Sequence, residues 1–442
     1  MSKATTANTI YSPRYRNYAL AILFIGYVVN FIDRSILSIL LEPIKQELLL
    51  SDTELGLLGG LAFAMFYATL GIPIASLADR WSRTKVLAIS MIIWSAMTAL
   101  CGAANNFLML LLARIGVGVG EAGASPPSHS LISDYFPVEK RATALSIYAL
   151  GIPFGSMIGN FVGGWGAAEL GWRMTFLLVG LPGIFVAGII LTTLREPPRG
   201  MSESAAVKAA AAKNDEPAPA LKEVFKFLWQ RKSFRHLGFA AGLHAFVGYG
   251  AGVWNAPFLI RSHEMPITEV GSWLAIISGI GAIGTFGGGY LGDKLSDWTD
   301  DRRWYLWIAG ISTLVMVPFQ FTAYLYDGIW TVIPALAVVS ILGGMYLGPS
   351  FAMTQALVTL RMRAVASALL LFMLNIIGMG LGPYFVGIAS DLLNPSFEIH
   401  SLRYALCLCV LANLWAAVHY FLGATTLRED LDSTEVLMTQ HS

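Results

Sequence analysis

Long apolar runs recur along the whole chain and constrain its fold more than any other feature. Each run of about 18–28 residues is long enough to cross a bilayer core of about 30 Å as a helix. Membrane-spanning strands would need alternation over about ten residues, which the runs do not show. The chain is 55% hydrophobic and 13% charged, so we expect an all-α membrane protein with twelve transmembrane helices. The runs occupy 17–42, 54–78, 86–104, 107–131, 141–167 and 173–194, and then 236–260, 270–292, 304–325, 328–350, 363–389 and 402–424.

A polar stretch separates the sixth run from the seventh. It contains Glu-Pro-Pro-Arg-Gly at 196–200, an alanine-rich segment, and Pro217 and Pro219. Its last part, 221–229, is either an amphipathic surface helix or a plain lead-in to the seventh run. The expected parts are an N-terminal six-helix bundle at 1–194, a cytoplasmic linker at 195–234, a C-terminal six-helix bundle at 235–424 and a cytoplasmic tail at 425–442.

Two short motifs recur in both halves. Ala-Ser-Leu-Ala-Asp-Arg at 75–80 is matched by Gly-Tyr-Leu-Gly-Asp-Lys at 289–294, and Glu-Lys-Arg-Ala at 139–142 is matched by Arg-Met-Arg-Ala at 361–364. The same order in each half indicates a duplicated six-helix unit, which is the symmetry of secondary transporters with a central site. We therefore expect two pseudo-symmetric bundles and a monomer, because one chain supplies both halves of the site.

The basic residues lie mainly on one side of the predicted membrane. Of the 29 Lys and Arg residues, two lie within apolar runs and four in outer segments. Those in the outer segments are Lys45, Arg173, Arg261 and Arg403. By the positive-inside rule, both termini and the linker are expected in the cytoplasm. The net charge of +1 gives no reason to expect nucleic acid as a partner, and Asp391 and Glu398 are expected to be solvated near an outer loop.

Charged side chains lie inside two apolar runs of the first half. Asn30, Asp33 and Arg34 fall at i, i+3 and i+4 and share one helical stripe. Arg114 and Glu121, seven residues apart, share one face of the fourth run. A charge in mid-span costs at least about 2.5–3.5 kcal/mol, so these groups should face the bundle interior or a wet cavity.

Two interpretations of these charges are open. One is a static buried network; the other, which we favour, is a proton site whose carboxylates exchange partners. Asp33 and Glu121 are then equal candidates for proton coupling. Arg34 and Arg114 are candidates for binding an anionic group of the substrate, because guanidinium suits phosphate and carboxylate. Whether Arg114 pairs with Glu121 or with the substrate is left open.

The second half has no matching acid or base in mid-run, so we expect it to supply shape and apolar surface. His244 could titrate but is expected to be structural. Polar side chains from both halves complete the substrate-binding candidates, which are Asn30, Tyr249, Trp254, Asn255 and Asn375.

The recurring loop motifs contain paired charges that could latch one conformation. A carboxylate at such a turn can cap a neighbouring helix or pair with arginine, and can release it in another state. The alternative is a basic loop that only sets topology, which would need no aspartate. We favour the latch. Its candidate residues are Asp79, Arg80, Arg83, Arg141, Asp293 and Lys294.

Glycines recur every four residues in the fifth run, at Gly151, Gly155, Gly159 and Gly163. This spacing predicts a face on which two helix backbones approach closely. The same face could also be a sliding surface between the two halves.

Motifs of nucleotide and metal chemistry are not supported. Gly118–Gly123 matches GxGxxG but follows no strand, and Gly287–Lys294 lacks the Gly-Lys-Ser/Thr of a phosphate loop. The cysteines lie in apolar runs and are interpreted as small core residues. We therefore expect a transporter, not an enzyme, with no cofactor and no metal, and with protons as the coupling ion.

Three motifs carry a resemblance to known families. They are Asn30-Phe-Ile-Asp33-Arg34, Gly116-Val-Gly-Val-Gly-Glu121-Ala with Ser133-Asp134-Tyr-Phe, and Arg195-Glu-Pro-Pro-Arg-Gly200. With the loop motifs they resemble the major facilitator superfamily, and more specifically the spinster family of lipid transporters.

The spinster resemblance implies the major facilitator fold, in the inner membrane of a bacterium. It also implies proton-coupled, alternating-access transport of lysophospholipid or sphingosine-phosphate-like molecules among the membrane lipids, with Asp33, Arg34, Arg114 and Glu121 at functional positions. The head group would lie by the first-half charges, and the acyl tail in the apolar second half. Gly120-Glu-Ala-Gly123 with Pro126 also resembles the anion:cation symporter family, so the alternative substrate is a small organic anion.

Overall fold

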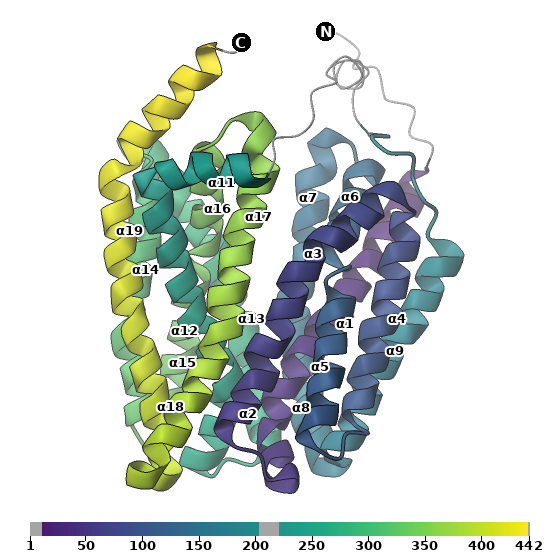
Figure 1. Cartoon of the computed structure of the whole chain (residues 1–442), viewed down its shortest axis with the longest axis vertical. Helices are drawn as coiled ribbons and strands as arrows, with labels where there is room; N and C mark the ends of the chain where they lie inside the picture. Colours follow the sequence, from purple (N-terminus) through teal and green to yellow (C-terminus); the bar gives the residue numbers. More distant parts are fainter. Residues whose placement is uncertain (1–10, 203–220, 441–442) are drawn as a thin grey trace. The chain divides into compact units, whose positions relative to one another are not determined.

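The computed structural model describes residues 11–202 and 221–440, and every apolar run lies on one or more helices (Figure 1). No strand occurs in these ranges, so the all-α prediction is confirmed there. The first six runs form α1 (Pro13–Leu48), α2 (Asp52–Gly56) with η1 (Leu57–Leu61) and α3 (Ala62–Arg80), α4 (Arg83–Cys101), α5 (Phe107–Glu121) with α6 (Ser125–Tyr135), α7 (Val138–Ala149) with α8 (Gly151–Glu169), and α9 (Gly171–Thr193).

The second half begins with a short helix, α11 (Leu221–Gln230), followed by the next six runs. Two stretches of π-helix, η1 and η3, interrupt the second and the eleventh run. The elements are α12 (Lys232–His263), α13 (Ile267–Thr299), α14 (Trp304–Leu325), α15 (Ile329–Gly344) with α16 (Leu347–Ala356), η2 (Leu360–Met362) and α17 (Arg363–Met373) with η3 (Leu374–Leu381) and α18 (Gly382–Phe397), and η4 (Glu398–His400) with α19 (Ser401–Gln440).

Ten stretches of the described residues are long and apolar enough to cross a membrane. One of them, Arg363–Val436, joins the eleventh and twelfth runs, and α12 is outside the set. Because α12 packs against α18, α19 and η3, it does not need to be apolar on every side. With α12 included and the joined stretch counted as two, the crossings match the twelve expected runs.

Polar side chains cap the starts of α2 and α5 in the first half. Ser51 accepts a hydrogen bond from the Glu54 backbone N–H at 3.1 Å, and the Glu54 carboxylate accepts one from the Ser51 N–H at 2.8 Å. This reciprocal capping box satisfies two N–H groups that the helix itself leaves unpaired. Asn106 caps α5 in a similar way, through the Met109 N–H at 2.9 Å. The sequence therefore specifies these helix starts locally.

The chain divides by its contacts into two units. Unit 1 comprises Met1–Ile36 and Phe66–Pro217, and unit 2 comprises Leu37–Met65 and Ala218–Ser442. Residues 37–65 thus pack with the second half, a division that differs from the expected bundles at 1–194 and 235–424. The expected tail at 425–442 continues α19 as far as Gln440, and the part of the linker at 203–220 lies outside the described residues.

Close backbone contacts explain why residues 37–65 belong to unit 2. A Cβ atom added to Gly56 would lie 2.6 Å from the carbonyl oxygen of Pro383, and one added to Gly60 would lie 2.7 Å from that of Gly380. Side chains larger than hydrogen would separate these helices. The π-helical segments η1 and η3 meet at this contact.

The glycine repeat of α8 packs on α1 within unit 1. A Cβ atom on Gly155 would lie 2.5 Å from the carbonyl oxygen of Val28, and one on Gly159 would lie 3.0 Å from that of Ile32. The packing interpretation is therefore confirmed. The further interpretation of this face as a sliding surface between the two halves stays a prediction.

Arg83 holds the segment after α9 against unit 1. Its buried guanidinium donates to Asp134, to Glu196 Oε1 at 2.7 Å and to the carbonyl oxygen of Pro197 at 2.7 Å. We call these four residues the Arg83 cluster. A fully buried arginine needs such partners, because an unpaired buried charge is costly. The start of the linker is therefore part of the folded unit.

Hydrogen bonds to Glu196 set its protonation state. Burial alone would raise the pKa of this carboxyl group, but the backbone N–H of Thr84 at 3.0 Å and the side chains of Arg83 and Ser82 lower the pKa below its ordinary value of 4.5. A lowered folded-state pKa means that the contribution to stability is present above the ordinary value. It is lost as the pH falls through the folded-state value.

Replacement of Gly155 by alanine should destabilise unit 1. The added methyl group would overlap the Val28 carbonyl, and overpacking typically costs about 1–3 kcal/mol. The measurement is the thermal unfolding midpoint of the purified protein, which should fall. Gly188→Ala is the matched control, because a Cβ there meets nothing within 4 Å. Equal midpoints for the two variants would contradict the close approach of α8 to α1.

Replacement of Glu196 by glutamine should lower the thermal midpoint at neutral pH. Arg83 would lose a charged partner while buried, which costs about 1–3 kcal/mol. The difference from the wild type should shrink as the pH falls through the folded-state pKa of Glu196, because the wild-type carboxylate is then protonated as well. Glu429→Gln, an exposed acid in α19, serves as control. A difference that is constant across this pH range would rule out the ion pair as the cause.

Candidate functional site

The charged side chains of the first and fourth runs come together inside unit 1. The i, i+3, i+4 spacing on α1 turns Asn30 and Asp33 into the interior, where both are fully buried. α5 brings Arg114 and Glu121, which are 3% and 1% exposed. We call these four residues and Arg34 the charge cluster of unit 1. The stripe predicted from the sequence therefore does face the bundle interior.

Arg34 and Glu121 form an ion pair between α1 and α5. The Arg34 Nε lies 2.5 Å from Glu121 Oε2, and the side chains are 18% and 0% exposed. The guanidinium carbon lies 4.6 Å from the ring centroid of Tyr67 and 5.0 Å from that of Phe31. Cation–π contacts of this kind stabilise a partly exposed guanidinium. Arg34 thus sits at the accessible side of the cluster, and Glu121 on the inner side.

Asp33 points to a different part of the interior. Neither carboxylate oxygen makes a hydrogen bond of normal geometry within the described ranges, although two potential donors lie nearby. Its electrostatic neighbours are Glu121 and Arg114, and Trp94 and Thr98 of α4 lie beside it. Buried polar groups are normally hydrogen-bonded, and an ionised carboxylate buried without donors is costly. The proton-site interpretation of this carboxylate stays a prediction.

Arg114 is an electrostatic neighbour of both acids. The close ion pair of Glu121, however, is with Arg34. The sequence left open whether Arg114 pairs with Glu121 or with the substrate. In this structure Arg114 is placed to balance the charge of Asp33 and Glu121 together.

The substrate-binding candidates of the second half lie in unit 2, apart from the charge cluster of unit 1 in the division by contacts. Trp254 is fully buried, and its indole N–H donates to the carbonyl oxygen of Pro383 at 2.8 Å, which joins α12 to α18. Asn255 accepts a hydrogen bond from the Tyr324 hydroxyl at 3.1 Å. Tyr249 is exposed, and Asn375 lies in η3, half-buried.

His244 has a structural role in unit 2, as expected. Its Nδ1 lies 2.8 Å from the Thr313 hydroxyl, and its Nε2 lies 3.0 Å from the carbonyl oxygen of Gly343. The ring packs 4.0 Å from the ring centroid of Tyr346. These contacts join α12 to α14 and α15.

The latch candidates occupy several separate contacts. Asp79 is exposed and lies 3.6 Å from Arg199, whereas Arg83 is the buried centre of the Arg83 cluster. In the second half, Asp293 accepts a hydrogen bond from the Tyr305 hydroxyl at 2.5 Å, and Lys294 lies 5.7 Å from a tyrosine ring centroid. Arg80 is exposed and Arg141 half-buried.

A second ionic cluster, which the sequence analysis missed, surrounds α2 in unit 2. Arg261 of α12 donates to both Asp52 carboxylate oxygens, at 2.8 and 2.9 Å, and to Glu42 at 2.6 Å. Lys45 lies 2.5 Å from Asp52. We call these four residues and Asp391 the α2 cluster. It connects the turn between α1 and α2 to helices of the second half.

Asp391 of α18 is the cap of α2. It accepts hydrogen bonds from the backbone N–H groups of Asp52 and Thr53 at 3.0 and 2.7 Å, and from the Thr53 hydroxyl at 2.6 Å. A carboxylate at a helix N-terminus also interacts favourably with the helix dipole. The expectation that Asp391 is solvated is therefore wrong. Local patterns could not reveal a partner more than 300 positions away in the sequence.

A third cluster has a sequence signal that the analysis overlooked. Asp301 is bound by Arg303 at 2.8 Å and by Arg428 of α19 at 2.9 Å, and the hydrogen bonds from Arg303 lower the pKa of Asp301 to about 2. Arg428 lies in Thr-Thr-Leu-Arg-Glu at 425–429, which repeats the same five residues at 192–196. The first copy lies at the end of α9 and the second within α19, and each contributes a charge to a cluster at the second loop of its half.

Known proteins resemble this chain in sequence and in fold. The model of the Major Facilitator Superfamily matches residues 23–424. An MFS-type efflux pump of Mycolicibacterium smegmatis is 33% identical over 423 residues, covering 95% of each chain. A hexuronate transporter of Bacillus subtilis is 27% identical over 272 residues, or 61% of this chain and 63% of that one.

A solved structure supports the same assignment. The crystal structure of a bacterial homologue of the human lysosomal transporter spinster, in an inward-facing and unoccupied conformation, is 32% identical with a TM-score of 0.85. It covers 95% of this chain and 99% of that chain. The expected major facilitator fold with twelve helices and the resemblance to spinster are confirmed. The chain belongs to the Major Facilitator Superfamily and is a multi-pass secondary transporter, not an enzyme.

Proposed function

We propose that this transporter moves single-chain amphipathic lipids, of the lysophospholipid or sphingosine-phosphate type, in exchange with or together with protons. The observation that carries the proposal is the charge cluster of unit 1, in which the fully buried Asp33 lies beside the ion pair of Arg34 and Glu121. The similarity to a spinster homologue supports the lipid class. The inner membrane of a bacterium with cytoplasmic termini is proposed from the positive-inside rule and this resemblance.

Arg34 and Arg114 would bind the substrate head group. Arg34 is partly exposed, and Tyr67 and Phe31 flank its guanidinium. A guanidinium fork matches the oxygens of phosphate, and the aromatic faces would pack against the first carbons of an acyl or sphingoid chain. Glu121 competes with the phosphate for the same guanidinium. Asn30, Tyr249, Asn255 and Asn375 are proposed as further substrate contacts.

Protonation would then control the competition. When Glu121 takes a proton it loses its charge, and Arg34 is released for the substrate. Asp33 is the second proton carrier, because it is fully buried and has a second acid, Glu121, as its neighbour. Protons are the coupling ion in this scheme, and neither a metal nor an organic cofactor is required. These charges would bias the equilibrium between the inward-facing and the outward-facing conformation.

A small organic anion is the second candidate substrate. The similarity to a hexuronate transporter favours it, and a carboxylate would bind the same guanidinium groups. The apolar second half distinguishes the candidates, because a hexuronate has no chain to bury there. Lipid transport would therefore use both the charges of the first half and the apolar surface of the second half. Anion transport would use only the charges of the first half.

The coupling residues can be tested in proteoliposomes with an imposed pH gradient. Wild-type protein should transport a lysophospholipid at a rate that depends on the gradient. Asp33→Asn with Glu121→Gln should remove that dependence, because neither position can then carry a proton. Glu169→Gln, an exposed acid of the same unit, should retain it. A double variant with an unchanged response to the gradient would refute the proton site, and uptake of glucuronate without lysophospholipid would establish the anion alternative.

The α2 cluster should act as a gate, because it ties residues 37–65 to the second half. Arg261→Ala removes the common partner of Asp52 and Glu42, and breaking a buried ion pair costs about 3–5 kcal/mol. Spin labels at the exposed positions 49 and 392, in a background without native cysteine, should show a new population at longer distance. Arg403→Ala, which breaks a pair with the exposed Asp327, should leave the distribution unchanged. An unaltered distribution in Arg261→Ala would exclude the gate.

A further inference from the structure

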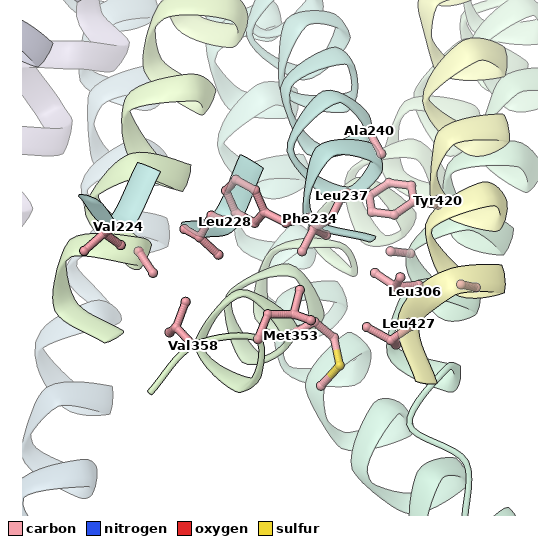
Figure 2. Close-up of a cluster of buried hydrophobic side chains, with 14 residues drawn as sticks. Val224, Leu228, Phe234, Leu237, Ala240, Leu306, Met353, Val358, Tyr420 and Leu427 are labelled. Carbon is pink, nitrogen blue, oxygen red and sulfur yellow. The ribbon is translucent and has the colours of Figure 1, made fainter. Parts of the chain in front are cut away.

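Helix α11 has two apolar faces, and among residues 11–202 and 221–440 the protein covers only one of them. Val224 and Leu228 are fully buried in a core cluster with Phe234 and Val358, as Figure 2 shows. Leu221, Phe225 and Trp229, at i, i+4 and i+8, lie on the second face.

The second face remains accessible although its residues are large and apolar. Leu221, Phe225 and Trp229 are 50%, 43% and 38% exposed. Counted at about 100° per residue, their face is rotated by about 80° from the centre of the buried face. Helix α11 runs across the ends of the upright helices of unit 2 (Figure 1).

The exposed face continues into the side of the transmembrane helices. The rings of Phe225 and Trp229 stack at 5.4 Å, Trp229 meets Phe239 of α12 at 6.1 Å, and Phe239 lies 5.8 Å from His419 of α19. Phe239 is exposed, as is Trp415, whose ring lies 5.9 Å from that of His419. We call these five residues the aromatic strip. It joins α11 directly to the exposed apolar sides of α12 and α19.

Basic residues border the exposed apolar face of α11. Lys222 and Lys226 are exposed and lie a further 80° or so around the helix, on the side away from the protein core. Arg231, Lys232 and Arg235 follow in the sequence. Apolar side chains at the level of the membrane edge, with lysines just above them, are the arrangement of a helix in the membrane interface.

We propose that α11 lies in the head-group layer of the leaflet on the side of the linker. Leu221, Phe225 and Trp229 insert among the acyl chains, and Lys222 and Lys226 bind the phosphates of anionic phospholipids. The proposal concerns a second lipid contact, separate from the transport site, and the cytoplasmic leaflet is named by the orientation proposed above. A soluble protein partner fits less well, because the aromatic strip leads down the sides of spanning helices.

The depth of each face can be measured on the full-length protein in vesicles of phosphatidylcholine and phosphatidylglycerol. Spin labels are attached to F225C, W229C, E223C or Q230C after Cys101, Cys407 and Cys409 have been replaced by alanine. Labels at 225 and 229 should be more accessible to oxygen than to a water-soluble nickel complex, and labels at 223 and 230 should show the reverse. If the labels at 225 and 229 are instead more accessible to the nickel complex than to oxygen, the insertion is refuted. This outcome would apply both to a face that is open to water and to a face that binds a soluble protein.

The choice of lipid gives an independent test. Phosphatidylglycerol should raise the thermal midpoint of the wild type above its value in phosphatidylcholine, and K222Q/K226Q should lose a large part of that shift, because each lysine near an anionic surface contributes to binding. R302Q removes one exposed positive charge at the turn between α13 and α14, and should keep the shift. Water-soluble glycerophosphoglycerol should not reproduce it. A full shift in K222Q/K226Q, or an equal shift with the soluble head group, would overturn the role of α11 in binding lipid.

Both tests remain distinct from the proposed transport function. Wild-type depth profiles and midpoints do not require a transported substrate or a pH gradient. Failure of α11 to insert would leave the charge cluster of unit 1 untouched, and loss of transport in variants of Asp33 would leave the position of α11 unchanged.

Discussion

The cost of charge in an apolar surrounding is the constraint on which the rest of this structure depends. Membrane helices cannot offer water to a buried ion, so each charge must find a partner inside the protein or change its protonation state. Arg34 and Glu121 meet this requirement through a contact of 2.5 Å, while Asp33 lies fully buried with Arg114 as a neighbouring cation. The chain thus holds two buried acids on neighbouring helices, each with an arginine nearby.

Sequence patterns predicted the helices and the charge cluster of unit 1, but not the ionic clusters at the helix ends. Asn30, Asp33 and Arg34 are three and four positions apart, so helical geometry alone places them on one stripe. Arg261 and Asp52 are 209 positions apart, and no local pattern links them. The repeated Thr-Thr-Leu-Arg-Glu would have pointed to the loop clusters, because duplication places equivalent residues at equivalent ends of each half. Long-range pairs therefore become visible only through symmetry or structure.

Two kinds of ionic cluster have different consequences for motion. The Arg83 cluster closes within unit 1 and ties the linker to the helices that precede it. The α2 cluster instead joins residues 37–65 to the second half, which follows them by more than 150 positions. The first can persist in every state of a transport cycle, whereas the second must open if the first half is to move as one body. Buried glycines such as Gly56 let this contact form without interlocking side chains, which makes its opening easier.

The boundary between the two units lies next to the charge cluster of unit 1 in the sequence. α1 passes from unit 1 to unit 2 after Ile36, two residues beyond Arg34, and α3 returns to unit 1 at Phe66, one residue before Tyr67. Tyr67 packs on the Arg34 guanidinium at 4.6 Å. Arg34 thus lies close to both positions at which the chain crosses between the units. If Glu121 takes up a proton as proposed, Arg34 loses its charged partner, and this loss would bias which unit residues 37–65 follow.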